Sequence, residues 1–225
     1  MGQAAGRAGS AGESIGIGWY VGARRGASGR VGPLYDVKMS LTNLPNRYGL
    51  ASKFFHWAVF VLFVYQFIGA NIMTRLGREG MAFGMNGDFY YNWHKSVGLI
   101  LFALAIARLI WRRTTRLPEW HPSLSDPERA IVSRLETWLY WLMFVMPVTG
   151  YLFVMAGGYG IKLFGIIDLP NPIGKQPAWS WIVWSLHIVF SYLALIVISW
   201  HIGLVLKKHV YERTGLADRM LPFRK

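Results

Sequence analysis

The sequence predicts an all-α integral membrane protein, a bundle of four transmembrane helices. Hydrophobic residues make up 53% of the 225-residue chain and charged residues only 16%, whereas about a quarter of the residues in an average soluble domain are charged. Four apolar stretches each have about the 20 residues that a helix needs to cross the hydrocarbon layer of a membrane. Because lipid offers no hydrogen-bond partners to an open sheet edge, these stretches must be helices.

The four helices are expected within a transmembrane domain over 46–222, at about 54–74, 94–112, 135–156 and 179–207. Tryptophan side chains are typical of the two interfaces between membrane and water. Five of the tryptophans lie near the ends of the expected helices: Trp57, Trp93, Trp111, Trp179 and Trp181.

Residues 1–45 are predicted to form a disordered N-terminal extension that is rich in Gly and Arg. Ten of the first 38 residues are glycine, and the segment has no apolar periodicity. Such a segment cannot bury enough surface to offset the entropy lost on ordering. It also lacks the apolar core of a signal peptide. Met39 opens a more ordinary sequence and is an alternative start of translation.

Basic residues alternate along the chain between rich and poor segments. Seven Lys and Arg residues lie in 1–53, two in 75–93, five in 112–134, two in 157–178 and six from 207 onward. Because cytoplasmic loops of membrane proteins are enriched in Lys and Arg, both termini and the 112–134 loop are expected in the cytoplasm. The net charge of +13 is then a topology signal, and no nucleic-acid partner is expected despite it.

The chain contains no cysteine. This absence excludes disulfides, thiolate zinc sites, cysteine-ligated iron–sulfur clusters and covalently attached c-type haem. Any redox cofactor must therefore be held by histidine, methionine, carboxylates or shape.

Four of the six histidines lie in or at the ends of the expected helices: His56, His94, His187 and His201. Ionisable side chains at membrane depth are costly and usually functional. His187 and His201 are separated by 14 residues, so they lie about 40° apart around one helix and about 21 Å apart along it. His201 matches His56 in depth on the inner side, and His187 matches His94 on the outer side.

These matched depths predict two b-type haems in the bundle core. The iron of one is expected between the inner pair of histidines, and the iron of the other between the outer pair. Ligation by two histidines leaves no open coordination site, which suits electron transfer. The competing interpretation is that membrane histidines are packed or hydrogen-bonded residues. His121, in a Pro-flanked loop, is expected to be a surface residue. His209, at the membrane edge, is expected to be solvated among the lipid headgroups, and it is the alternative to His201 as an inner ligand.

Three arginines near the inner boundary are candidates for contacts with haem propionates: Arg47, Arg108 and Arg112. A guanidinium pairs well with a carboxylate. Interfacial snorkelling of these long side chains is the competing account.

Several segments resemble the bacterial cytochrome b561 family over about 46–222. They are RYGLASKFFHW (47–57), WHKSVGLILFALAIARLIWR (93–112), MPVTGYLFVMAGG (146–158), the region of the two histidines of the fourth helix, and KKHVYERTG (207–215). The resemblance implies a four-helix bundle in the bacterial inner membrane with two haems b per chain. It implies the same four iron ligands, named above as matched pairs. Family members exchange electrons with the quinone pool, and one branch oxidises superoxide at the periplasmic face while reducing ubiquinone.

Three functions follow from these observations. The first is an oxidoreductase that passes electrons from a small reductant, with superoxide a candidate, to quinone. The second is a haem-bearing anchor subunit that relays electrons for a partner dehydrogenase or hydrogenase. The third is a transporter that uses histidine as a proton relay, although the chain lacks the internal repeats common in transporters. Expected partners are membrane lipid, quinone and a redox protein, and the oligomeric state is left open.

Overall fold

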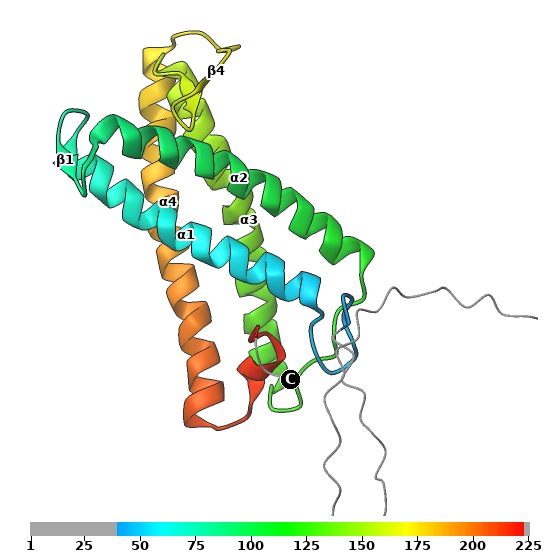
Figure 1. The fold of residues 1–225 in the computed structure, drawn as a ribbon. Coiled ribbons are helices and arrows are strands. Elements are labelled where there is room, and N and C mark those ends of the chain that lie inside the picture. Colours follow the sequence, from blue (N-terminus) through cyan, green and yellow to red (C-terminus); the bar gives the residue numbers. More distant parts are fainter. Residues whose placement is uncertain (1–39, 223–225) are drawn as a thin grey trace, which may run out of the picture.

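A computed structural model describes residues 40–222, and they form four long helices (Figure 1). The helices are α1 (Leu50–Leu76), α2 (Gly87–Thr114), α3 (Asp126–Ala156) and α4 (Pro177–Leu206). A π-helical turn, Lys207–Tyr211, and a 3-10 turn, Leu216–Arg219, follow α4. The predicted extension lies mostly outside the described residues.

Two short hairpins connect the helices at one end of the bundle. Strands β1 (Met81–Ala82) and β2 (Met85–Asn86) join α1 to α2, and strands β3 (Ile161–Leu163) and β4 (Ile167–Leu169) join α3 to α4. We call this end of the molecule the hairpin end. Neither hairpin was predicted from the sequence, because each strand is only two or three residues long.

The helices begin earlier than the apolar stretches from which they were predicted. The largest difference is at α3, which begins at Asp126 instead of 135. A capping box between Ser125 and Glu128 closes its first turn and satisfies the N–H groups there. At α2, the side chain of Asn86 accepts the N–H of Phe89. Polar first turns of this kind lie outside the apolar run, so hydropathy alone misses them.

The four helices pack as two antiparallel pairs that cross (Figure 1). Helix α1 packs on α2, α3 packs on α4, and α2 also contacts α3, whereas α1 and α4 scarcely touch. The core between α3 and α4 contains Leu135, Leu142, Ala194 and Val197. The two helix pairs therefore meet mainly through α2 and α3, and α1 stands apart from α4.

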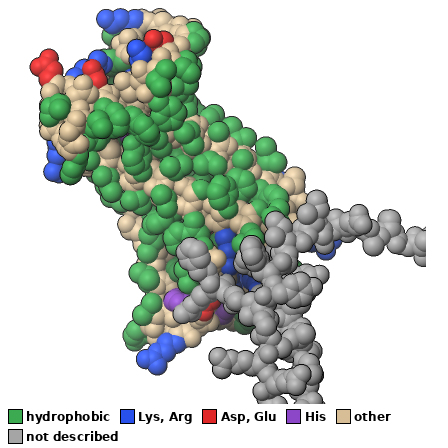
Figure 2. Space-filling model, in the orientation of Figure 1, with side chains coloured by type: hydrophobic (Ala, Val, Ile, Leu, Met, Phe, Trp, Pro, Cys, Tyr) green, Lys and Arg blue, Asp and Glu red, His purple; other side chains and the backbone are tan. Residues whose placement is uncertain are grey.

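The surface matches that of a membrane-spanning protein. Hydrophobic side chains cover the middle of the face seen in Figure 2, and charged side chains gather toward its two ends. All four helices are long and apolar enough to cross a membrane. A soluble protein would not expose so many large apolar side chains. The predicted fold class, an all-α bundle of four transmembrane helices, is confirmed.

The C-terminal segment packs over the start of α1 at the end opposite the hairpins. Lys53 donates from Nζ to the carbonyl of Leu221 (2.8 Å), and Trp57 donates from Nε1 to the carbonyl of Met220 (2.9 Å). Asn43 accepts the backbone N–H of Gly49 (3.0 Å). Both ends of the described chain therefore lie here, at what we call the terminal end.

A buried lysine joins three segments at the terminal end. Lys208 lies 2.6 Å from the carboxylate of Glu128 and 2.8 Å from that of Glu212. It also donates to the carbonyl of Ser123 (3.2 Å). This ion-pair cluster fixes the turn after α4 against the start of α3.

Candidate functional site

A large cavity lies between the α1–α2 pair and the α3–α4 pair. Its volume is about 1460 Å³, and its lining runs from Lys162 at the hairpin end to Met220 at the terminal end. Sites for a single small ligand usually measure roughly 300–1,000 Å³. The cavity is therefore large enough for more than one bulky group.

All four predicted ligand histidines line this cavity, and they lie in two pairs. The ring centres of His94 (α2) and His187 (α4) are 6.5 Å apart. Those of His56 (α1) and His201 (α4) are 6.3 Å apart. The structure thus brings together the inner and outer pairs that the sequence predicts, with the outer pair toward the hairpin end.

The spacing within each pair fits one metal ion held between two imidazoles. A metal–imidazole bond is about 2 Å long, so two rings that share a metal have their centres roughly 6 Å apart. Among residues 40–222, no group of three or more His, Cys, Asp or Glu side chains could bind a bare metal ion. Two protein ligands per iron is the arrangement expected when a macrocycle supplies the others.

His187 is seated by two neighbouring residues of α3. The hydroxyl of Thr149 lies 3.0 Å from Nδ1 of His187. The same hydroxyl donates to the carbonyls of Val145 and Met146, so the imidazole N–H is the donor to Thr149. A Cβ at Gly150 would lie 3.0 Å from Cε1 of His187. Glycine is thus required for the ring to pack this closely against α3.

His94 is bordered by Gln66 of α1. Gln66 donates from Nε2 to the backbone carbonyl of His94 (2.8 Å). Within residues 40–222, neither Gln66 Oε1 nor His94 Nδ1 has a hydrogen-bond partner, although both atoms are buried. The sequence prediction did not include Gln66 or Thr149, because neither residue type is itself a ligand.

Two arginines lie at the inner pair. Nη2 of Arg108 is 3.5 Å from Nδ1 of His56, and the guanidinium groups of Arg108 and Arg112 each lie 5.4 Å from the ring centre of Tyr140. Arg112 also forms an ion pair with Glu136 (2.8 Å). Both arginines line the cavity, so each could pair with the carboxylate of a group bound in it. Their contact with haem propionates stays a prediction.

The third predicted arginine, Arg47, is placed differently. Its backbone pairs with Leu44 just before α1, and it is not among the residues that line the cavity. The neighbouring Tyr48 does line it. Burial, with the nearby Glu136 carboxylate, raises the pKa of Tyr48, so its hydroxyl stays protonated.

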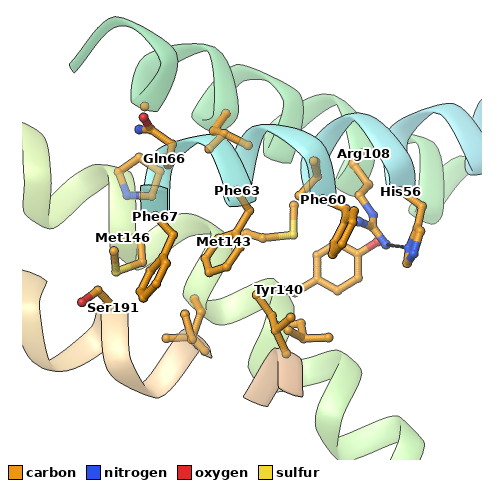
Figure 3. Close-up of a pocket in the computed structure, with 18 of the residues that line it drawn as sticks. His56, Phe60, Phe63, Gln66, Phe67, Arg108, Tyr140, Met143, Met146 and Ser191 are labelled. Carbon is orange, nitrogen blue, oxygen red and sulfur yellow. Dashed lines mark hydrogen bonds between the residues drawn. The ribbon is translucent and has the colours of Figure 1, made fainter. Parts of the chain in front are cut away.

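Apolar side chains separate the two histidine pairs. Phe60, Phe63 and Phe67 follow His56 along one face of α1 and point into the cavity (Figure 3). Met143 and Met146 lie opposite them on α3 (Figure 3). This lining makes the space between the pairs apolar. The helical spacing of the three phenylalanines is visible in the sequence and is a signal that could have identified this face.

Cationic side chains lie at the hairpin end of the cavity. Lys95 donates to the carbonyl of Gly160 (3.0 Å). The guanidinium of Arg78 stands 5.7 Å from the ring centre of Tyr159 and 3.9 Å from the carboxylate of Asp88. All five residues line the cavity.

The two remaining histidines lie nearer the cavity than the sequence suggests. Both His121 and His209 line it at the terminal end. Nδ1 of His121 is 2.8 Å from the hydroxyl of Ser123, and burial lowers the pKa of His121. Nε2 of His209 is 3.9 Å from Asp218. Both side chains are half-buried, so they are at the surface as expected but only partly solvated.

Comparisons with known proteins identify the family of this chain. A sequence model of one family, described as prokaryotic cytochrome b561, matches residues 47–223. The chain is also 28% identical to cytochrome b561 homolog 2 of Escherichia coli strain K12, over 190 residues that cover 81% of this chain and 95% of the relative. The matched range contains all four transmembrane helices and both histidine pairs. This chain therefore belongs to the prokaryotic cytochrome b561 family of membrane electron-transfer proteins, which hold b-type haem.

Proposed function

We propose that this protein is a di-haem cytochrome that carries electrons from a small reductant at its hairpin end to a quinone, with ubiquinone the expected acceptor. The observation that carries the proposal is the presence of two histidine pairs in one cavity, with ring centres 6.3 and 6.5 Å apart. We call the haem expected between His94 and His187 the outer haem, and the one expected between His56 and His201 the inner haem.

A b-type haem, when bound, supplies reversible one-electron chemistry at its iron. The protein's part is to hold each group through two imidazoles, so that no coordination site stays open to oxygen. The phenylalanines and methionines between the pairs exclude water, and Arg108 and Arg112 are the candidates to meet propionates. His187 and His201 are 14 residues apart on one helix, about 21 Å along its axis, so the two centres form a relay through the membrane.

Superoxide is the candidate reductant because it is a small anion. Lys95 and Arg78 at the hairpin end of the cavity favour the approach of an anion. Two superoxide ions would each lose one electron and leave as oxygen, and those two electrons with two protons would convert one quinone to quinol. The proposed placement is in the bacterial inner membrane, with the hairpin end periplasmic and both termini cytoplasmic, as the distribution of Lys and Arg favours.

The proposal is tested first by the absorption spectrum of the detergent-purified protein, oxidised and dithionite-reduced, with haem counted per chain. Two haems per chain with a sharp reduced α band support it. His187→Ala is then expected to remove the outer haem and leave the inner one. A colourless protein would contradict the proposal and return the histidines to a proton-relay role.

A lysine variant tests the choice of reductant. Lys95→Gln is expected to slow the reduction of the haems by superoxide, more strongly at low ionic strength, and to leave their reduction by dithionite unchanged. Lys175→Gln is a matched control, because Lys175 lies near the same end of the molecule but is not among the cavity-lining residues. Equal rates for all three proteins would count against superoxide.

The second candidate function is that of an anchor subunit for a partner redox protein. The favouring observation is that both hairpin tips expose large apolar side chains, with Phe83 89% and Ile166 79% accessible. Such residues at the hairpin end could contact a partner that delivers electrons there. Co-purification of a stoichiometric redox protein from native membranes, and its loss in Phe83→Ser, would favour this function over reaction with a small reductant.

A further inference from the structure

We propose that Gln66 is a positioning residue for His94. Its carboxamide oxygen accepts a hydrogen bond from the Nδ1–H of His94, which fixes the imidazole ring and lowers the reduction potential of the outer haem. The inference rests on the proposed two-haem function. It gives a role to Gln66, a residue in the membrane interior that does not itself bind iron.

The first observation is a pair of complementary atoms that both lack a partner. Within the described part of the chain, Gln66 Oε1 and His94 Nδ1 are buried without a hydrogen bond. When Nε2 of an imidazole binds a metal, Nδ1 carries the proton and becomes a donor. An amide oxygen is an acceptor. An unpaired buried polar atom destabilises the folded protein, so each atom removes the other's penalty by pairing with it.

The second observation is that the Gln66 side chain already binds the backbone of His94. Gln66 Nε2 donates to the carbonyl of His94 at 2.8 Å. The nitrogen must be the atom that faces this carbonyl, because an amide oxygen there would face another acceptor. Oε1 is therefore the polar atom of this amide that stays available to the imidazole of the same residue.

The third observation is a space that the sequence leaves for this amide. A Cβ at Gly98, one helical turn after His94, would lie 3.2 Å from Gln66 Nε2. Such a contact is tighter than most real Cβ contacts, so glycine is what lets the amide approach α2 closely. Gly98 and Gln66 thus act together to bring a polar group to His94.

The other ligand of the outer pair shows the same arrangement already formed. Nδ1 of His187 is 3.0 Å from the hydroxyl oxygen of Thr149. Metal-bound histidines commonly donate their second N–H to an oxygen, which sets the ring orientation and raises ligand basicity. With Gln66 in place, both outer ligands donate to neutral oxygens and stabilise ferric iron. At the inner pair, by contrast, His56 faces the cation of Arg108, which favours the reduced state.

The consequence is a downhill direction for electrons, from a lower-potential outer haem to a higher-potential inner haem. The test is a spectroscopic redox titration of Gln66→Leu. The variant is expected to keep two haems, with the reduction equilibrium of the outer haem shifted by about tenfold toward the reduced form, 59 mV for one electron. The inner haem is expected to keep its potential. The outer haem is identified as the one that His187→Ala removes.

A conservative variant separates hydrogen bonding from packing. Gln66→Glu keeps an oxygen acceptor, so the outer potential is expected to equal or lie below that of the parent protein. Ser185→Ala is a matched control, because Ser185 makes the same kind of bond to a helix carbonyl (3.0 Å to Trp181) away from the cavity lining. It is expected to shift neither potential.

The outcomes are distinct. An unchanged outer potential in Gln66→Leu, or an equal shift of both haems, would overturn the inference. If Gln66→Leu loses the outer haem, retention by Gln66→Glu supports the inference and loss in both variants refutes it. A parent protein with fewer than two haems would instead refute the proposed function.

Discussion

The guanidinium of Arg108 lies 3.5 Å from Nδ1 of His56, so a fixed positive charge borders one of the two predicted ligands of the inner haem. A guanidinium is a donor only and cannot accept a hydrogen bond from an imidazole N–H. The charge therefore acts on this ligand electrostatically, by making it a weaker electron donor.

Removal of this charge is expected to lower the potential of the inner haem. Arg108→Gln should shift its reduction equilibrium toward the oxidised form by about tenfold, 59 mV for one electron, because reduced iron loses a stabilising cation. Redox titration followed by absorption measures the shift. Arg113→Gln, a change on the same helix at an exposed residue outside the cavity lining, is the control. A fall of similar size in both variants would mean that only net charge matters.

Gly150→Ala is expected to weaken binding of the outer haem. The new methyl group would lie 3.0 Å from Cε1 and 3.4 Å from Nδ1 of His187, and α3 cannot move its backbone away cheaply, so the ring must shift. Haem content should fall toward one per chain while the inner haem's spectrum persists. Gly69→Ala adds the same methyl group to α1 where nothing lies within 4 Å. Haem loss from Gly69→Ala as well would point to a general effect on helix assembly.

Thr149→Val is expected to loosen the orientation of His187 without removing the ligand. The change keeps the shape of the side chain but leaves the imidazole N–H without the acceptor at 3.0 Å, a penalty of about 1–3 kcal/mol for a buried donor. The outer potential should rise and its electron paramagnetic resonance signal should broaden. Thr149→Ser restores the hydroxyl and should restore both properties. An unaltered signal in the valine variant would exclude this bond as an orienting contact.

The ion-pair cluster at Lys208 predicts a pH dependence of stability. A hydrogen bond from Lys208 lowers the pKa of Glu212 below its ordinary value of 4.5. Because the folded pKa is the lower one, the stabilisation is complete above the ordinary value and is lost as the pH falls through the folded pKa. The melting temperature of the parent should therefore exceed that of Glu212→Gln above about pH 5, with the difference vanishing in stronger acid.

A control for this pH dependence is Glu79→Gln, which removes an exposed carboxylate near the hairpin end. Its melting temperature should follow that of the parent at every pH. A constant gap between the parent and Glu212→Gln down to acid pH would contradict the role of the ion pair.

The sequence was sufficient to predict the four helices and the depth pairing of the histidines. Both depend on periods along one chain segment, such as the 14 residues between His187 and His201. The start of α3 at Asp126 was missed because a capping box is polar, and hydropathy detects only what lies in lipid. The contacts of Gln66 and Thr149 were missed for another reason. They depend on how one helix is rotated against its neighbour, and that rotation is set by packing of the whole bundle.

The positions of the arginines show the same limit at smaller scale. Arg47, Arg108 and Arg112 lie at similar depth in the sequence, yet only the latter two line the cavity. Arg47 precedes α1, where the backbone pairing of Leu44 with Arg47 directs the chain before the helix begins. The depth of a residue in the membrane can be counted along the sequence. The direction in which a side chain outside a helix points cannot be counted in this way.

The sparse contact between the α1–α2 pair and α4 has a consequence for assembly of the bundle. In each histidine pair one ring comes from the α1–α2 pair of helices and the other from α4, so a bound haem cross-links two halves that otherwise meet mainly through α2 and α3. Any ligand that binds only the folded state adds its binding free energy to stability. On the proposed ligand assignment, haem insertion would thus complete the tertiary structure of the bundle.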